Sequence, residues 1–366
     1  MASNAVSLRE GQVPLSCHFC NKEAVQWKCE ECGVFMCTLC KEKIHQRLKS
    51  IQDHEIVSVS DIWKDTPPRR EVASEVISSV LNTYTTTFPV ICSLLCSGDD
   101  CLYFMYNTAT ENARLMKGKI FKSTIRIINT LEKRLFDIAV NRNYEVFLTE
   151  INDKNDVLIL TSSGEIKTVL DTSPMMPLSL HVNKDNELIV GLREQGPAYP
   201  VTDFSVRQVL IFDNGYKKKV TLETDTKGRK LFSYPARIKT DSKNVLYVAD
   251  WTGENNSGRL VAVDVNGRLK FTYNGNTDLN AFSPHGIAIT ASDNIILSDW
   301  NNNALHILNY KGELLGIHFV DKEYNIIRPL SLCIDSEGYL LIGRGLLNET
   351  LSDAKIYVTK IAEYFM

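Results

Sequence analysis

The sequence predicts a mainly β protein, in which a small metal-binding module and a short helical linker precede a six-bladed β-propeller. Two observations lead to this prediction. Eight cysteine and histidine side chains stand at metal-ligand spacing within residues 17–54, and alternating apolar runs restart six times between residue 89 and the C-terminus. A chain of 366 residues, 44% of them hydrophobic, has enough apolar surface for one small and one large domain.

The expected boundaries follow from these patterns. We expect a flexible tail over residues 1–12 and the metal-binding module over residues 13–60. A linker with a short amphipathic helix follows over residues 61–82, and the propeller covers residues 83–366.

The potential metal ligands of the module are, in chain order, Cys17, Cys20, Cys29, Cys32, Cys37, Cys40, His45 and His54. Sulfur and imidazole ligands at short spacings are typical of tetrahedral zinc sites. A segment this short buries too little apolar surface to fold alone, so zinc would supply its folding free energy. Disulfides would require a secreted chain, and the N-terminal residues show no basic segment followed by an apolar run.

The ligands could form two successive fingers or one interleaved unit. Only four residues separate Cys32 from Cys37, too few for two separate sites to lie side by side without sharing loops, so the spacing favours interleaving. In that cross-brace, one zinc takes Cys17, Cys20, Cys37 and Cys40, and the second takes Cys29, Cys32, His45 and His54. Two zinc ions are therefore expected.

This ligand order resembles the B-box zinc finger of the tripartite-motif family. In that family the ubiquitin-ligase activity resides in a RING domain before the B-box. Only 16 residues precede Cys17, so we expect no RING in front of it.

The linker is predicted to contain about three turns of helix, because the apolar residues between Glu71 and Leu81 recur at helical spacing. This length gives fewer than two heptads, whereas a coiled coil needs at least three or four. We therefore expect a monomer or a weak dimer.

The propeller prediction depends on an internal repeat. Aligned inner strands begin at residues 89, 135, 177, 235, 284 and 329, which gives spacings of 46, 42, 58, 49 and 45 residues. Glycine-containing turns recur between later strands, at Ser163-Gly164, Asn214-Gly215, Asn266-Gly267 and Lys311-Gly312. Asn-Gly favours a type I′ turn with positive φ at both central residues. Six units of three or four strands at this period are typical of a six-bladed propeller.

The strand count also predicts how the propeller closes. After the last inner strand only two more strands fit, so Thr83–Phe88, which is β-branched and aromatic, is expected to complete the final blade. Residues 284–315 resemble an NHL repeat at its Pro-x-Gly, Ser-Asp and Asn positions. The two resemblances together imply a tripartite-motif-like protein with an NHL-type propeller.

A recognition surface is predicted where Trp251 and Trp300 follow the second strands of neighbouring blades. Loops at these positions rise on one face, and they also carry Asn255, Asn256, Asn301, Asn302 and Asn303. The alternative, that each Trp packs between blades as core, stays open. Lys227, Arg229 and Lys230 form a basic cluster and are further candidates for partner binding, although the negative charges of Glu223 and Asp225 weaken the positive field.

Charge and motifs favour an interaction protein over an enzyme. Residues 1–89 carry 10 basic and 11 acidic side chains, and residues 90–366 carry 31 and 33, which argues against a polyanion ligand. His181, His285 and His306 lack repeated partners, and no phosphate loop or Gly-x-Ser-x-Gly motif is present.

The expected function is a cytoplasmic zinc-binding adaptor whose propeller binds a protein. The family resemblance implies work in ubiquitination or innate-immune signalling assemblies. Ubiquitin-ligase activity through the B-box or a RING partner, and RNA binding through the propeller, are the alternatives.

Overall fold

A computed structural model divides the chain into two compact units, Met1–Glu71 and Val72–Met366. It describes residues 17–21, 25–29, 32–43, 54–59, 76–98, 101–106, 113–121, 124–151, 154–254, 257–345 and 354–366. Among these residues, no helix is both long and apolar enough to cross a membrane.

The first unit contains a three-stranded antiparallel sheet in the order β2-β1-β3. Its elements are β1 (Trp27–Cys29), β2 (Phe35–Met36), α1 (Thr38–Lys43) and β3 (Ile56–Ser58). The buried cluster of its described residues consists of Met36 and four cysteines, with Trp27 and Val34 packed against it. So small an apolar core cannot hold a fold without cross-links or metal.

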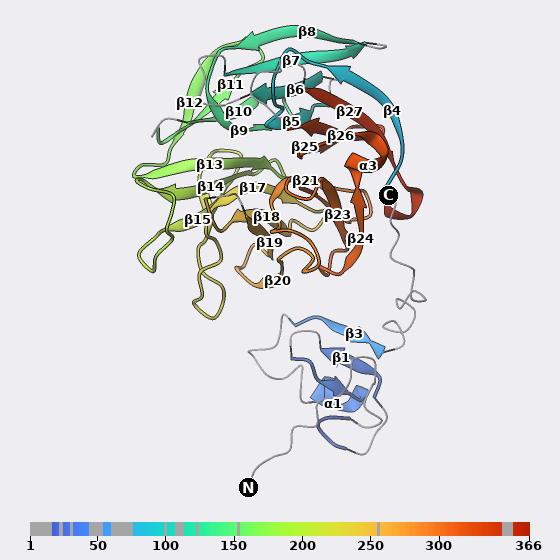
Figure 1. Ribbon diagram of the computed structural model, residues 1–366. Helices are drawn as coiled ribbons and strands as arrows, with labels where there is room; N and C mark the ends of the chain where they lie inside the picture. The colour runs from blue at the N-terminus through green and yellow to red at the C-terminus, as the bar shows by residue number, and fades with distance from the viewer. Residues whose placement is uncertain are drawn as a thin grey trace. The chain divides into compact units, whose positions relative to one another are not determined.

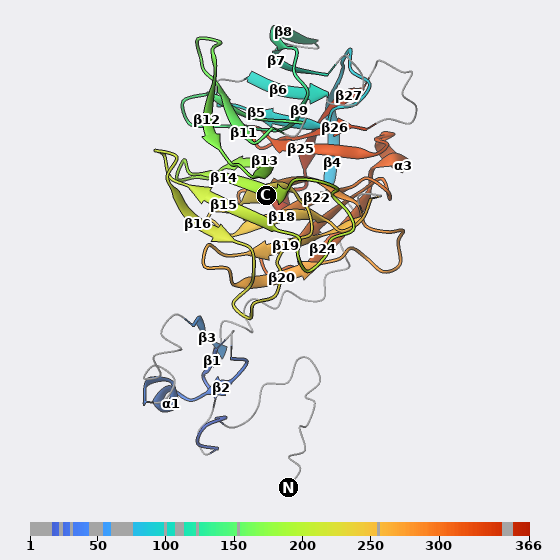
Figure 2. The same ribbon diagram turned by 90° about the vertical axis from the view of Figure 1, so that its left-hand side faces the viewer.

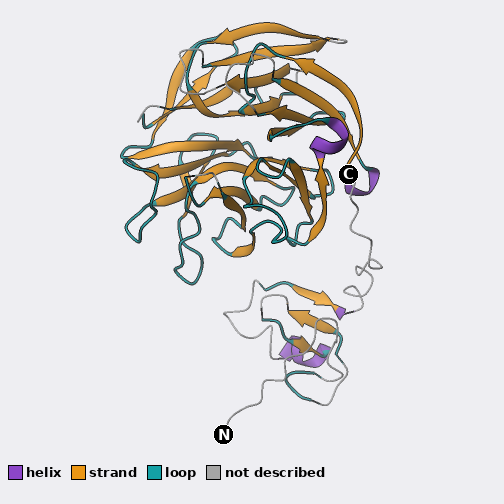
Figure 3. Ribbon diagram, viewed as in Figure 1, coloured by secondary structure: helices purple, strands orange, loops and turns teal. Residues whose placement is uncertain are grey.

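Strands joined by loops and turns make up most of the second unit's described part (Figure 3). Six four-stranded antiparallel sheets are found there, and Figure 2 shows the strands of one of them, β13 to β16, side by side. The first strands of the sheets are β5 (Ser93–Cys96), β9 (Leu135–Val140), β13 (Met175–Val182), β17 (Pro235–Thr240), β21 (Pro284–Ile289) and β25 (Pro329–Ile334). The second strands are β6 (Cys101–Tyr106), β10 (Val146–Glu150), β14 (Leu188–Glu194), β18 (Leu246–Trp251), β22 (Ile295–Asp299) and β26 (Leu340–Arg344).

The third strands are β7 (Arg114–Phe121), β11 (Asp156–Leu160), β15 (Arg207–Phe212), β19 (Gly258–Val263), β23 (Ala304–Leu308) and β27 (Lys355–Ile361). The fourth strands are β8 (Thr124–Leu131), β12 (Ile166–Asp171), β16 (Lys218–Leu222), β20 (Leu269–Tyr273), β24 (Leu314–Phe319) and β4 (Ile77–Thr85). Two short helical segments, α3 (Val320–Tyr324) and η3 (Glu363–Phe365), complete the described elements. The first strands contact one another in a closed ring, which makes the sheets the six blades of a β-propeller and confirms the predicted fold.

Strand direction gives the propeller two distinct faces. Pro235 pairs with Asp250 and Pro329 pairs with Arg344, so first strands begin where second strands end. We call this side the loop face, because the loops between second and third strands and those between blades both lie there. The turns between third and fourth strands lie on the opposite face.

The apolar core lies between the blades. Six clusters each combine residues of two neighbouring blades, as where Phe147 of the second blade packs with Val190 and Leu192 of the third. Hydroxyl groups add hydrogen bonds across the same boundaries: Thr149 Oγ1 donates to Leu178 O at 2.7 Å, and Ser179 Oγ donates to Pro235 O at 2.7 Å. Each blade is thus held to the next by both packing and hydrogen bonds.

The hairpin turns differ from the type I′ prediction. Only one residue in each turn has positive φ: Gly164, Tyr216, Gly267 and Gly312, at 85°, 61°, 76° and 85°. In the turn at Asp264, its Oδ1 accepts N–H groups from Asn266 and Arg268, at 2.9 and 3.0 Å. The polar first residue therefore stabilises a turn that is longer than a two-residue type I′ turn. A β-bulge in the strands beside the turn accommodates the extra residue.

The last blade takes its fourth strand from the beginning of the unit. β4 runs antiparallel to β27, from Thr85 opposite Lys355 to Ile77 opposite Ile361 (Figure 1, where β4 is cyan and β27 is red). This strand begins earlier than the Thr83–Phe88 expected, and it includes residues 77–81, where helix was predicted. A short apolar run can form either a helix or a strand. Here it forms a strand, because it pairs with the open edge of β27. Residues 61–75 of the expected linker lie outside the described residues.

Candidate functional site

The first predicted ligand set lies together in the first unit. The Sγ atoms of Cys17, Cys20, Cys37 and Cys40 all lie within 4.8 Å of one another. A tetrahedral zinc site with Zn–S bonds of about 2.3 Å has sulfur atoms about 3.8 Å apart, so these four sulfurs fit around one ion with little movement. Helix α1 places Cys40 one turn after Cys37, and Cys40 N lies 3.5 Å from Cys37 Sγ.

Three residues of the second set also lie together. His54 Nδ1 lies 3.5 Å from Cys29 Sγ and 3.1 Å from Cys32 Sγ, close to the edge lengths of a zinc tetrahedron. Cys29 ends β1, and His54 stands just before β3, which pairs with β1. The sheet itself therefore brings these ligands together. His45, the fourth expected ligand, lies outside the described residues.

The electrostatics of the four-sulfur cluster favour a cation at its centre. Burial and hydrogen bonds with Cys37 and Cys17 raise the pKa of Cys40 to about 12. Burial acts in the same direction on Cys17, but backbone N–H groups, first among them that of Cys37, lower the pKa of its thiol to about 6. Thiolates this close repel one another, and a divalent cation removes the repulsion. Within the described residues, these are the only two groups of three or more potential metal ligands.

The two tryptophans of the expected recognition surface lie half-buried on the loop face. Trp251 Nε1 donates to Pro284 O at 2.8 Å, and its ring stacks on Tyr234 with centroids 5.6 Å apart. The guanidinium group of Arg328 lies over the ring of Trp300, with Arg328 Cζ 4.3 Å from the ring centroid. Each indole therefore bridges neighbouring blades while keeping part of its surface exposed, which combines features of both alternatives.

The described asparagines beside them make hydrogen bonds both within their own loop and to the loops before β21 and β25. Asn301 Nδ2 donates to Ala281 O at 2.8 Å, and Asn302 Nδ2 donates to Asp299 Oδ2 at 2.7 Å. Asn303 Oδ1 accepts the N–H of Arg328 at 2.8 Å. These amides shape the loops of the fifth blade. Asn255 and Asn256 lie outside the described residues.

The aspartates before the tryptophans have a structural role that the sequence did not reveal. Asp250 is fully buried, and its Oδ1 accepts two N–H groups, from Ser233 and Tyr234, both at 2.7 Å. Burial raises its pKa, against the opposing effect of Arg259, whose Nε lies 2.9 Å from Oδ2. Asp299 is likewise buried, 3.2 Å from His306 Nε2. Each carboxylate lies at the end of the second strand of a blade and accepts one or two backbone N–H groups from residues just before the first strand of the same blade.

Two exposed residues of the basic cluster, Arg229 and Lys230, make contacts within the chain. Arg229 pairs with Asp225 at 2.7 Å. Lys230 Nζ donates to the carbonyl groups of Asp203 and Ser205, both at 2.5 Å, which belong to the loop over residues 195–206. Lys230, although exposed, therefore contacts this loop.

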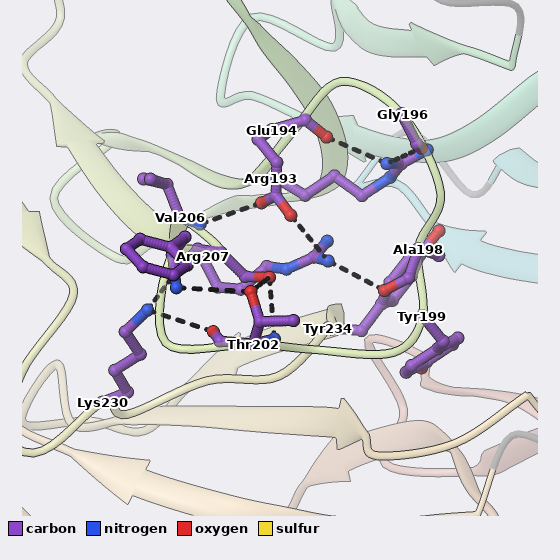
Figure 4. A network of polar contacts seen from close by, with 12 residues as sticks. Arg193, Glu194, Gly196, Ala198, Tyr199, Thr202, Val206, Arg207, Lys230 and Tyr234 are labelled. Atoms are coloured by element: carbon purple, nitrogen blue, oxygen red, sulfur yellow. Dashed lines mark hydrogen bonds and ion pairs between the residues drawn. The ribbon is translucent and has the colours of Figure 1, made fainter.

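The loop over residues 195–206 encloses Arg207, as Figure 4 shows. Arg207 is 1% exposed, and its Nη2 lies 3.0 Å from Glu194 Oε1 and 2.8 Å from Ala198 O. Burial lowers its pKa, although Glu194 opposes the change. Within this loop, Phe204 is 93% exposed. The 58-residue spacing of this blade was the one sequence signal for an unusual loop.

Aromatic side chains form a continuous arc on the loop face. It comprises Phe136, Tyr199, Tyr234, Trp251, His285 and Trp300, which we call the aromatic arc. The ring centroid of Tyr234 lies 6.1 Å from that of Phe136 and 6.0 Å from that of Tyr199. The ring centroids of Trp251 and His285 are 5.0 Å apart. His285 lies 6.3 Å from Trp300, which ends the arc. Its members come from the second to fifth blades.

His285 is 8% exposed, and its Nε2 has no hydrogen-bond partner among the residues that the structure describes. Burial, helped by the nearby Arg237, lowers its pKa to about 3. Below pH 6.5 the unfolded chain gains a proton that folded His285 does not bind, so stability falls as the pH decreases from 6.5 towards 3. At pH 5 this loss amounts to about 2 kcal/mol.

His285→Gln should therefore weaken the pH dependence of folding. We expect urea unfolding to show a smaller difference between pH 7 and pH 5 in this variant than in the wild type, by about 2 kcal/mol. Equal differences in the two proteins would mean that His285 is protonated in the folded state.

Comparisons with known proteins agree with this organisation. Residues 12–59 match the model of the B-box zinc finger family. No curated protein sequence matches the chain. Among solved structures, a putative gluconolactonase is 11% identical, with a TM-score of 0.57. The match covers 80% of this chain and 97% of the gluconolactonase chain. A gluconolactonase from Xanthomonas campestris is 12% identical, with a TM-score of 0.55 and coverage of 75% and 88%. A streptogramin B lyase is 12% identical, with a TM-score of 0.51 and coverage of 77% and 97%.

The fold and the ligand clusters define the class: a zinc-finger module joined to a β-propeller. The family match identifies the module as a B-box zinc finger, which confirms the prediction from ligand spacing. At such low identity, the similarity to solved structures shows the propeller fold alone.

Proposed function

We propose that the protein is a zinc-binding adaptor of tripartite-motif type, whose propeller binds a protein partner and whose B-box mediates association. The observation that carries this proposal is the aromatic arc on the loop face, beside a loop whose Phe204 is 93% exposed. Half-buried tryptophan and tyrosine on a rigid scaffold provide anchor area at small entropic cost, as in protein-binding hot spots. A cytoplasmic location and a role in ubiquitination or signalling assemblies belong to the same proposal.

Affinity capture with the full chain tests the propeller's part. Phe204→Ser should lose partners that the wild type retains, because an exposed aromatic anchor is removed without disturbing the core. Phe121→Ser is the matched control: Phe121 is 64% exposed and ends β7 on the opposite face. Identical protein sets from both variants would contradict a partner site at the loop face.

The B-box is proposed to hold two zinc ions, one in each ligand cluster. Metal analysis of protein purified without chelator should give two zinc ions per chain, because one cluster brings four sulfur atoms together and the other brings two sulfur atoms and an imidazole nitrogen together, at distances that suit a tetrahedral site. Only the set with Cys29, Cys32 and His54 depends on His45, so His45→Ala should lower the content towards one ion. One zinc per wild-type chain would contradict the cross-brace.

A further inference from the structure

The fourth strand of the first blade, β8, lies at the outer rim of the propeller (Figure 1 and Figure 2). It pairs with β7 on one side, and no other strand that the structure describes pairs with its second edge. β8 has eight residues, whereas the fourth strands β12, β16, β20 and β24 have five or six. A long strand with an unpaired edge offers backbone N–H and C=O groups to a further strand.

The side chains of β8 leave this edge apolar. Ile127 and Ile128 are 43% and 54% exposed. Ile128 is the extra residue of a β-bulge, which leaves two consecutive apolar side chains at the surface. Natural edge strands are commonly protected by lysine, as β16 is by Lys218 and Lys219, but β8 contains no lysine. The edge of β8 is therefore suited to pairing with an extended segment of another chain.

A cavity of about 230 Å³ lies beside this edge, between the first and second blades. Its apolar lining includes Leu115, Leu131, Val146 and Leu160, and Asn129 contributes a polar group. A cavity of about 150 Å³ is large enough to bind benzene, so this one accommodates an aromatic side chain. Because Asn129 and Leu131 belong to β8, a strand paired with β8 would run next to the cavity.

Tyr144 also lines the cavity, and its backbone conformation is unfavourable for tyrosine. Its φ is 61°, in the left-handed region that glycine, asparagine and aspartate tolerate better. The same turn recurs in later blades, where the equivalent residue also donates its N–H to the carbonyl oxygen three residues earlier. Those residues are Asn186, Asn244, Asp293 and Gly338. A strained tyrosine that stays 44% exposed beside a cavity indicates a binding role.

The charge around β8 has one sign. The hairpin of β7 and β8, residues 114–131, contains five basic side chains and no acidic one. Arg126 is exposed, and it has no hydrogen bond or ion pair with any residue that the structure describes. Like charges disfavour the pairing of β8 with a second copy of itself, and they favour a partner segment with acidic side chains.

We propose that β8 and the adjacent cavity bind an extended segment of a protein partner, which contains an aromatic residue and at least one acidic residue. The segment adds a fifth strand to the first blade along residues 126–131, with its aromatic side chain in the cavity and an acidic side chain beside Arg126. Phe121, opposite Thr124 at the start of the hairpin's second strand, lies outside this surface. The surface shares no residue with the aromatic arc, so this interaction goes beyond the proposed function.

Tyr144→Asn in the full chain tests the role of the cavity. Asparagine is the residue that the third and fourth blades have at the equivalent position, so the substitution should not lower the melting temperature. Tyr310→Asn is the matched control, because Tyr310 is a 51% exposed tyrosine in a turn of the fifth blade. Arg126→Gln tests the charge.

The probes are short peptides of alternating valine and threonine, with one central tyrosine or phenylalanine and one aspartate or glutamate at varied positions. The first control peptides have serine in place of the aromatic residue, and the second have an amide in place of the acid. A third set carries N-methyl groups on one or the other series of alternate peptide nitrogens. N-methylation removes the donors of a β-ladder, and only one series of N–H groups faces β8.

We expect the wild type to prefer peptides with both an aromatic and an acidic residue, and one N-methylated series to lose binding. Tyr144→Asn should weaken binding about tenfold or more, a free-energy change of about 1.4 kcal/mol. Arg126→Gln should remove the preference for acid over amide, and Tyr310→Asn should bind as the wild type does.

Three results would overturn the proposal: no binding of any aromatic, acidic peptide, full affinity in Tyr144→Asn, or equal binding of both N-methylated series and the unmodified peptides. A dimer of the wild-type protein that Ile128→Lys dissociates would identify a second copy as the occupant of β8, and would also contradict it. None of these readouts involves Phe204, so the proposed function can stand where this inference fails.

Discussion

A chain lacking residues 1–89 is expected to melt about 10 °C or more below a chain lacking residues 1–70. The longer deletion removes β4, which pairs with β27 at seven residue positions. Each ladder hydrogen bond contributes about 1 kcal/mol net, and burial of Ile77 and Tyr84 adds further stability. In a domain of this size, each kcal/mol corresponds to roughly 2 to 4 °C in melting temperature.

Thermal unfolding of the two truncated chains, with light scattering to detect aggregation, measures the effect. The chain lacking residues 1–70 retains β4 and serves as the control, because it lacks the B-box equally. A full-length Tyr84→Ser variant should fall between the two, since Tyr84 is 4% exposed within the core of the sixth and first blades. Equal melting temperatures of the truncated chains would show that β4 contributes little to closure.

Replacing Cys37 by Ser is expected to unfold the B-box and leave the propeller folded. Cys37 belongs to the four-sulfur cluster and is part of the small buried core of its unit. Loss of one thiolate reduces zinc affinity, and metal binding supplies most of the folding free energy of so small a module. The unit is therefore expected to lose structure completely.

Zinc content and limited proteolysis measure this outcome. The variant should contain less zinc, and the described part of the first unit should become sensitive to protease while the described part of the propeller stays resistant. Cys92→Ser is the matched control, because Cys92 is a partly buried cysteine of the propeller outside both ligand clusters. A protease-resistant B-box in Cys37→Ser would mean that the fold does not depend on this cluster.

The propeller was predictable because each blade repeats the same local signals. Apolar alternation and polar turns recur at a regular spacing, so errors in one blade do not change the fold class. The ligand clusters were predictable because the short spacing of the ligands favours an interleaved unit, in which Cys17, Cys20, Cys37 and Cys40 form one set.

Features made by long-range pairing were harder to predict. Residues 77–81 have apolar spacing that fits a helix, and only the edge of β27 makes them a strand. The aromatic arc joins Tyr199, Tyr234 and His285 from separate loops and strands, which no local pattern brings together. The hydrogen bonds that the amides of Asn301, Asn302 and Asn303 make depend on loop shape, which no local sequence pattern specifies.

The pairing of β4 with β27 also has a consequence for folding during synthesis, because the two strands leave the ribosome at different times. Thr85 pairs with Lys355, so β4 emerges from the ribosome about 270 residues before its partner. At about 5 to 20 residues per second, the strand waits about 15 to 55 s with its edge unpaired. During that interval the nascent chain is most exposed to wrong pairings, and chaperones would have their main opportunity to act on it.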